Sequence, residues 1–116
     1  MEKVLEIRWH GRGGQGAQTG ALMLAETAAQ LGKYVQGFPE FGPERMGAPI
    51  QAFNRISDEP IHIHSNVINP QIVIVLDPTL LGERVTAGFP EAGVYIINTT
   101  KSPQEVREAL NLKGGK

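Results

Sequence analysis

The sequence predicts an α/β fold, a three-layer α/β/α sandwich whose sheet is mostly parallel with one antiparallel hairpin. Two observations support this prediction. The β-branched segments Ile72–Leu76 and Val94–Ile97 lack period-2 polarity, which is typical of parallel strands buried on both faces. Segments with helical periodicity alternate with predicted strands along the chain, as expected where helices cross over between neighbouring strands.

The first third of the chain is predicted as strand, turn, helix and strand. Residues Lys3–Trp9 form a short strand, and the glycine-rich turn Gly11–Gly16 leads into a helix over Gln15–Leu31. Alanines and leucines recur on one stripe of that helix, so we expect it to lie close against the sheet and to end at Gly32. Lys33–Gln36 is predicted as a second short strand.

Two alternating segments in the middle of the chain predict the antiparallel part of the sheet. Ile50–Ile56 and Pro60–Ser65 both alternate between apolar and polar residues. Only Ser57-Asp58-Glu59 separates them, so we expect the two segments to pair as a hairpin.

Local capping signals predict two further helix starts. Asp77-Pro78 follows a buried strand and is typical of an N-cap with proline at the first helical position. Ser102-Pro103-Gln104-Glu105 is a capping box, which predicts a helix from Pro103 to Leu112.

The composition excludes several classes of function. The 116 residues contain no cysteine, which rules out disulfides, thiolate zinc sites, a cysteine nucleophile and cysteine-ligated clusters on this chain. A formal net charge of −1 gives no electrostatic signature for binding nucleic acid or an anionic membrane. No apolar run approaches the roughly 20 residues of a membrane span, and no secretory signal is visible. We therefore predict a single cytoplasmic domain over residues 1–116.

The glycine-rich turn permits three interpretations. Gly11, Gly13 and Gly16 match G-x-G-x-x-G between a strand and a helix, the context of a dinucleotide fingerprint. The fingerprint also needs an acidic residue about 20 residues on, and Leu31 to Phe38 contains none, so we predict a Rossmann-like fold that does not bind NAD. Two other interpretations remain open. The glycines either form a tight turn that requires positive φ, or they form a site for an anion or a partner at the helix N-terminus. The residues of this candidate anion cradle are Arg12, Gly13, Gly14, Gln15 and Gly16.

A long irregular loop is predicted over Gly37–Pro49, and loops of this length are more often functional than not. Its aromatic residues either fold back over the core of the domain or, together with a methionine and an arginine between prolines, form an interface with a partner protein. The candidate interface residues are Phe38, Pro39, Glu40, Phe41, Glu44, Arg45, Gly47 and Pro49.

Other residues suggest less. His62 and His64 could hold a metal, yet no third ligand is evident nearby, so they are predicted as surface residues. Trp9 is predicted in the core or in an interface. Asp77 ends a buried strand, where α/β sites often lie, but an N-cap role accounts for it. The sequence predicts no catalytic residue and no metal site.

Seven segments, in the same order and spanning nearly the whole chain, resemble one known family. They are Ile7–Ala17, Gly32–Gln36, Phe38–Arg45, Gly47–Pro49, Arg55–Ile61, Val75–Leu81 and Ile97–Thr99. The chain thereby resembles the γ subunit of the 2-oxoacid:ferredoxin oxidoreductases, especially of the pyruvate enzyme. Subunits of that family continue well beyond the position of Lys116, so the resemblance implies a γ domain that is incomplete at its C-terminus.

The resemblance implies a part in the oxidative decarboxylation of a 2-oxoacid with coenzyme A. The 2-oxoacid that it implies first is pyruvate. The products are acyl-CoA, carbon dioxide and reduced ferredoxin. In that family other subunits hold thiamine diphosphate, Mg²⁺ and 4Fe–4S clusters, and the implied partners are catalytic α and β subunits, a ferredoxin-like δ subunit and ferredoxin. This chain would then be the cluster-free, non-redox subunit, contributing interfaces and part of the coenzyme A site. The alternative is a stand-alone nucleotide-binding or structural α/β module.

Overall fold

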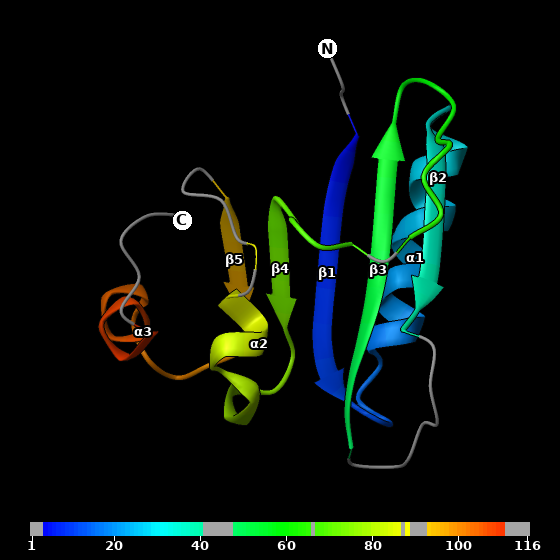
Figure 1. Ribbon diagram of the computed structural model, residues 1–116. Coiled ribbons are helices and arrows are strands. Elements are labelled where there is room, and N and C mark those ends of the chain that lie inside the picture. Colours follow the sequence, from blue (N-terminus) through cyan, green and yellow to red (C-terminus); the bar gives the residue numbers. More distant parts are fainter. Residues whose placement is uncertain (1–3, 41–47, 66, 87, 89–92, 111–116) are drawn as a thin grey trace.

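A computed structural model describes residues 4–40, 48–65, 67–86, 88 and 93–110. Within these residues one sheet carries helices on both faces (Figure 1). The elements in chain order are β1 (Leu5–Arg12), α1 (Ala17–Gln30), β2 (Tyr34–Pro39), β3 (Pro49–Ser57), β4 (Ile72–Val75), the 3₁₀ helix η1 (Pro78–Leu80), α2 (Glu83–Thr86), β5 (Val94–Ile97) and α3 (Pro103–Leu110).

The sheet has the strand order β2-β3-β1-β4-β5. β4 is parallel to β1 and to β5, whereas β3 is antiparallel to β1 and to β2. The predicted α/β fold is confirmed, with one correction. The sheet is mixed rather than mostly parallel, because the strands on one side of β1 are all joined by antiparallel pairing.

The predicted hairpin is wrong in its second strand. Residues 60–64 are not a strand, and β3 instead pairs with β2, from Tyr34 opposite Ser57 to Pro39 opposite Ala52. β1 occupies the other edge of β3, so no edge was left for residues 60–64. β2 is also longer than expected, because Phe38 packs against Phe53 of β3 with 5.2 Å between the ring centroids.

Helix α1 lies very close to the sheet, as its alanine stripe predicts. Ala17, Ala21, Ala25 and Ala28 are all buried. Gly20 permits the close approach, since a Cβ atom there would lie 2.7 Å from the Trp9 ring. Trp9, predicted in the core or in an interface, is therefore half-buried under α1 and packs within the domain.

Helix α2 lies on the opposite face of the sheet from α1 (Figure 1). Its Val85 is buried against Val73 and Val75 of β4, and Tyr95 and Ile97 of β5 pack beside this cluster. The layers therefore divide the sheet: α1 covers the strands β2, β3 and β1, and α2 covers β4 and β5 on the other side.

The helix ends follow the capping signals. The capping box is confirmed: Ser102 N donates to Glu105 Oε1 at 3.0 Å, and Glu105 N donates to Ser102 Oγ at 3.2 Å. Asp77 is confirmed as an N-cap, but the element that it begins is the short helix η1. Residues 111 and 112, the predicted end of the last helix, lie outside the described residues. Among those described, no helix is long and apolar enough to cross a membrane.

Candidate functional site

The carboxyl ends of β1 and β4 meet at one edge of the sheet. The two strands are parallel neighbours, and Leu76 N donates to His10 O at 2.9 Å where they end. The chain leaves β1 for α1 on one face and leaves β4 for α2 on the other (Figure 1). Such a switch between faces opens a crevice beyond the strand ends, and this is where open α/β sheets bind ligands.

The glycine-rich turn lies at this edge. Gly14 and Gly16 have φ angles of 93° and 97°, a region that disfavours residues with a Cβ atom. The turn is closed by a hydrogen bond from Gln15 N to Arg12 O at 3.0 Å and held by one from Gly13 N to Ala48 O at 2.9 Å. The interpretation as a tight turn that needs positive φ is confirmed.

Four side chains from the two strand ends form one polar cluster, which we call the switch-point cluster: Arg12, Gln15, Asp77 and Thr79. Arg12 Nε lies 3.1 Å from Asp77 Oδ2, and Arg12 Nη2 donates to Thr79 Oγ1 at 3.0 Å. Gln15 Nε2 donates to the same Asp77 oxygen at 2.9 Å, and its Oε1 accepts from Arg12 N at 2.7 Å. Asp77 thus anchors the glycine turn as well as capping η1. The sequence signal for this second role was its position at the end of a buried strand.

Hydrogen bonds hold the pKa of Asp77 well below its usual range. The largest effect comes from the Thr79 hydroxyl, followed by the Gln15 amide and the Thr79 backbone N–H, with Arg12 adding a smaller attraction. In the unfolded chain the same carboxyl titrates near its ordinary pKa of about 3.9. Its ionised form therefore stabilises the fold above that pH, and this contribution is lost as the pH falls toward the lower folded-state pKa.

We expect Asp77→Asn to flatten the acid side of the stability profile. The free energy of unfolding, measured by urea titration between pH 7 and pH 3, should fall less steeply below about pH 4 than in the wild type. Asp58→Asn is the matched control, because Asp58 is an exposed carboxylate in a surface pair with Lys33. Equal slopes for Asp77→Asn and the wild type would contradict the expectation.

A shallow hollow of about 210 Å³ lies at the N-terminus of α1. It is lined by Gly14, Gly16, Ala17, Gln18, Thr19 and Ile50. The first turn of α1 contains no acidic residue, and Gly16 makes no side-chain cap. The first N–H groups of a helix have no intrahelical acceptor and carry partial positive charge, so this hollow suits an anion.

The predicted cradle is therefore divided in two. Gly14 and Gly16 line the hollow, whereas the side chains of Arg12 and Gln15 belong to the switch-point cluster. Gly13 holds the turn in place through the hydrogen bond from its N–H to Ala48 O. The glycines and the Arg12 guanidinium thus lie at the same edge of the sheet, but they do not form one binding site.

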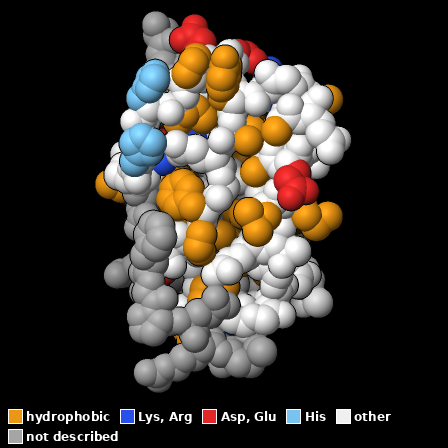
Figure 2. Space-filling model, turned by 90° about the vertical axis from the view of Figure 1, so that its right-hand side faces the viewer, with side chains coloured by type: hydrophobic (Ala, Val, Ile, Leu, Met, Phe, Trp, Pro, Cys, Tyr) orange, Lys and Arg blue, Asp and Glu red, His pale blue; other side chains and the backbone are white. Residues whose placement is uncertain are grey.

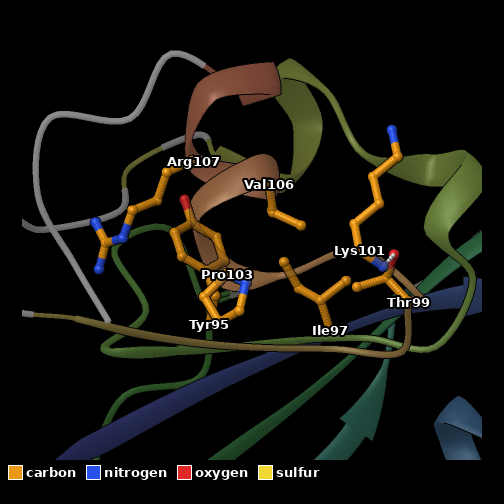
Figure 3. A pocket seen from close by; sticks show the side chains of 7 residues that line it. All are labelled: Tyr95, Ile97, Thr99, Lys101, Pro103, Val106 and Arg107. Atoms are coloured by element: carbon orange, nitrogen blue, oxygen red, sulfur yellow. Dashed lines mark hydrogen bonds between the residues drawn. The ribbon is translucent and has the colours of Figure 1, made fainter.

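A second pocket, of about 230 Å³, lies between β5 and α3. Figure 3 shows an apolar centre formed by Ile97, Val106 and the Tyr95 ring, with Lys101 and Arg107 pointing away from each other on either side. None of these residues carries a sequence signal for a site, because the periodicity of the strand and the helix accounts for the apolar ones. This lining suits a ligand with an apolar centre that fits between Ile97 and Val106. Negatively charged groups of the same ligand would lie at the margins, near Lys101 and Arg107.

The predicted docking loop is partly strand. Phe38 lies in β2, half-buried, with the Arg55 guanidinium carbon 5.6 Å from its ring centroid, so this aromatic packs on the sheet of the domain itself. Pro39 ends β2, Glu40 N donates to Gln51 O at 2.9 Å, and Pro49 begins β3. The remaining candidates lie outside the described residues; they are Phe41, Glu44, Arg45 and Gly47.

The histidines differ in their surroundings. His62 and His64 are exposed, as predicted. The structure shows no group of three metal-ligating side chains among the residues that it describes. His10 is buried, and its Nε2 accepts a hydrogen bond from Arg8 Nε at 2.8 Å.

Comparison with known proteins identifies the family. The family model described as pyruvate ferredoxin/flavodoxin oxidoreductase matches residues 6–116. The chain belongs to this family. Within it, the chain is 51% identical over 113 residues to pyruvate synthase subunit PorC of Thermotoga maritima, covering 97% of this chain and 59% of that protein. It is 55% identical over 114 residues to the pyruvate/ketoisovalerate oxidoreductases common subunit gamma of Thermococcus kodakarensis, covering 97% of this chain and 62% of that protein.

Solved structures share the fold of this chain. The crystal structure of the Thermotoga maritima pyruvate oxidoreductase subunit superposes with a TM-score of 0.85 at 49% identity, over 97% of this chain and 60% of that one. A 2-oxoglutarate:ferredoxin oxidoreductase from Magnetococcus marinus shares the fold at 19% identity, with a TM-score of 0.75 over 99% of this chain and 19% of that one. The chain spans about 60% of the length of the curated relatives that it matches.

Proposed function

We propose that this chain is the γ subunit of a 2-oxoacid:ferredoxin oxidoreductase and that the 2-oxoacid is pyruvate, which the names of its relatives include. The observation that supports the proposal is identity above 50%, over nearly the whole chain, to subunits named for pyruvate synthase and for pyruvate/ketoisovalerate oxidoreductases. The complex would convert a 2-oxoacid and coenzyme A into acyl-CoA and carbon dioxide and would pass two electrons to ferredoxin.

In this proposal the chain is the non-redox subunit of the complex. It has no cysteine to ligate an iron–sulfur cluster, so the clusters, with thiamine diphosphate and Mg²⁺, would be held by the other subunits. The proposed partners are the catalytic α and β subunits and a ferredoxin-like δ subunit. What this chain adds is surface for assembly and an anion site near the switch point.

The hollow at the N-terminus of α1 is the proposed binding site for a phosphate group of coenzyme A. Backbone N–H groups and the helix dipole favour a phosphate there, and no acidic side chain in the first turn of α1 opposes it. The switch-point cluster would act indirectly, because Asp77 and Arg12 fix the turn that carries Gly14 and Gly16.

Thr19→Glu is the sharpest test of this site. A carboxylate at this exposed position of the first turn stabilises the helix but repels phosphate from the hollow, so we expect the KM for coenzyme A of the assembled enzyme to rise about tenfold, with the KM for the 2-oxoacid unchanged. Thr19→Gln is the control of equal size without charge. An unchanged coenzyme A KM in Thr19→Glu would exclude phosphate binding at the hollow. Arg12→Ala should also raise this KM, by releasing the turn.

The segment from Phe38 to Pro49 is proposed to dock against the catalytic subunits. Native mass spectrometry of the protein from its source should find it bound to larger, cysteine-containing subunits. The double variant Phe41→Ala/Arg45→Glu should then be released from the complex, because aromatic and arginine side chains dominate interface energies. The double variant should be released, while Glu108→Gln, a change at an exposed position of α3, should stay in the complex as the surface control. Co-purification of both variants in equal amounts would contradict docking through this segment.

A further inference from the structure

The outer edge of β2 offers backbone groups for another strand. β2 is an edge strand of the sheet. Glu40 N donates to Gln51 O, and hydrogen-bonded pairs recur at every second residue of an antiparallel ladder, so the even-numbered residues of β2 bond to β3. The peptide groups of Val35 and Gly37 consequently point away from the sheet.

Exposed apolar side chains flank this edge on both sides. On α1, which packs against β2, the exposed fractions are 53% for Leu22 and 62% for Met23. On the other side Tyr34 is 50% and Ile63 is 38% exposed, and Ile63 O accepts a hydrogen bond from Gln36 Nε2 of β2. Figure 2 shows hydrophobic side chains gathered over α1 and β2 on this side of the molecule. We call the outer edge of β2 with Leu22, Met23, Tyr34 and Ile63 the β2 edge surface.

The β2 edge surface lacks the devices that keep exposed edges from pairing. Natural edge strands are usually protected by charged side chains, bulges or proline. β2 has the sequence Tyr-Val-Gln-Gly-Phe-Pro, with no charge and only the final Pro39 as a barrier. The exposed charges beside it include the carboxylates of Glu26 on α1 and Glu40 after β2. Lys33, which precedes β2, is already paired with Asp58, so the surface suits an occupant that brings a basic residue.

We propose that the β2 edge surface binds an extended apolar segment of another subunit of the same complex, which adds a strand antiparallel or parallel to β2 and places a basic side chain against Glu26. This inference rests on the proposed function. It is also continuous with the proposed docking segment, since β2 ends at Pro39 within it. A second copy of this chain fits less well, because it would bring a second set of Glu26 and Glu40 carboxylates to the interface.

Recognition through backbone groups would also suit a subunit that is shared by two enzymes, and one relative is named as such a subunit. The Thermococcus kodakarensis relative is a subunit common to pyruvate and ketoisovalerate oxidoreductases. Strand addition draws its affinity from main-chain hydrogen bonds, which partners of different sequence can supply equally.

Amide hydrogen exchange on the isolated chain and on the complex co-expressed with its other subunits tests the proposal. The amides of Val35 and Gly37 should exchange at least about tenfold more slowly in the complex, while those of Gln36 and Phe38, already bonded to β3, should change little. Exchange at Val35 and Gly37 that is equal in the two samples would overturn the proposal.

Substitution gives an independent reading of the same surface. Leu22→Asp/Met23→Asp should weaken assembly at least about tenfold and leave the unfolding midpoint of the isolated chain nearly unchanged. Ile68→Asp is the control, since Ile68 is 68% exposed and its backbone lies next to Gly88, which follows α2. Full assembly of the double variant would count against the surface.

The outcomes also separate this inference from the function on which it rests. A wild-type chain that joins the complex without protection at Val35 and Gly37 overturns the β2 edge surface alone. A wild-type chain that joins no complex overturns the proposed function. Protection of both amides in the isolated chain, together with the mass of a dimer, would assign the edge to a second copy and overturn the choice of occupant.

Discussion

Replacing Arg55 by alanine should lower the free energy of unfolding by about 3–5 kcal/mol. The Arg55 side chain is 1% exposed, and its Nε donates to Glu6 Oε2 at 2.7 Å. Its Nη1 donates to Gln36 Oε1 at 3.0 Å, so the guanidinium joins β3 to both of its neighbouring strands. Truncation leaves the Glu6 carboxylate without its cation, opens a cavity and removes the contact with the Phe38 ring.

Urea unfolding of the chain measures this loss of stability, and two further variants serve as controls. Lys33→Ala breaks the exposed pair with Asp58 and should cost less than about 1 kcal/mol. Arg55→Met/Glu6→Gln removes both charges while keeping much of the volume, so it should recover most of the lost stability. A similar destabilisation for Arg55→Ala and Lys33→Ala would show that the buried pair is not the main contribution of Arg55.

Local signals in the sequence predicted the elements better than they predicted strand pairing. The alanine stripe of α1, the capping box at Ser102 and the N-cap at Asp77 each depend on residues within one or two turns, and the structure confirms them. The pairing of β3 with β2 depends on contacts such as that of Phe38 with Phe53. Alternation identifies a strand but does not say which other strand it meets, so the predicted partner, Pro60–Ser65, was wrong.

The candidate site was predicted in part for the same reason. The glycine turn and its positive φ angles could be inferred from spacing alone. The pairing of Arg12 with Asp77 could not, since 65 residues separate them and only the adjacency of β1 and β4 brings them together. The N-cap role was sufficient to explain Asp77 from the local sequence, so its second role, anchoring the glycine turn, was not predicted. Buried polar residues such as Asn54 were missed because an alternating strand pattern treats them as surface positions.

Asn54 is the second position where we expect a large loss of stability. Its side chain is fully buried between β3 and α1. Nδ2 donates to Ala21 O at 2.9 Å and to Gln36 O at 3.2 Å, and Oδ1 accepts from Trp9 Nε1 at 2.8 Å. Asn54→Leu keeps the volume but leaves these groups without Asn54 as partner. Because each buried polar group left unpaired costs about 1–3 kcal/mol, we expect a loss on the order of 3 kcal/mol.

A double-mutant cycle separates the hydrogen bonds from packing. Trp9→Phe removes the indole donor, so Asn54→Leu should cost about 1 kcal/mol less in that background than in the wild type. Asn54→Leu should also loosen α1, because the bond to Ala21 O ties the middle of the helix to β3. Faster amide exchange in α1 would reveal this loosening, and the candidate anion hollow at the N-terminus of α1 would then lose phosphate affinity without any change in its lining residues. If the losses in the free energy of unfolding for the two substitutions are additive, the hydrogen bond between them contributes little. The close packing of α1 on the sheet would then be the main source of stability in this region.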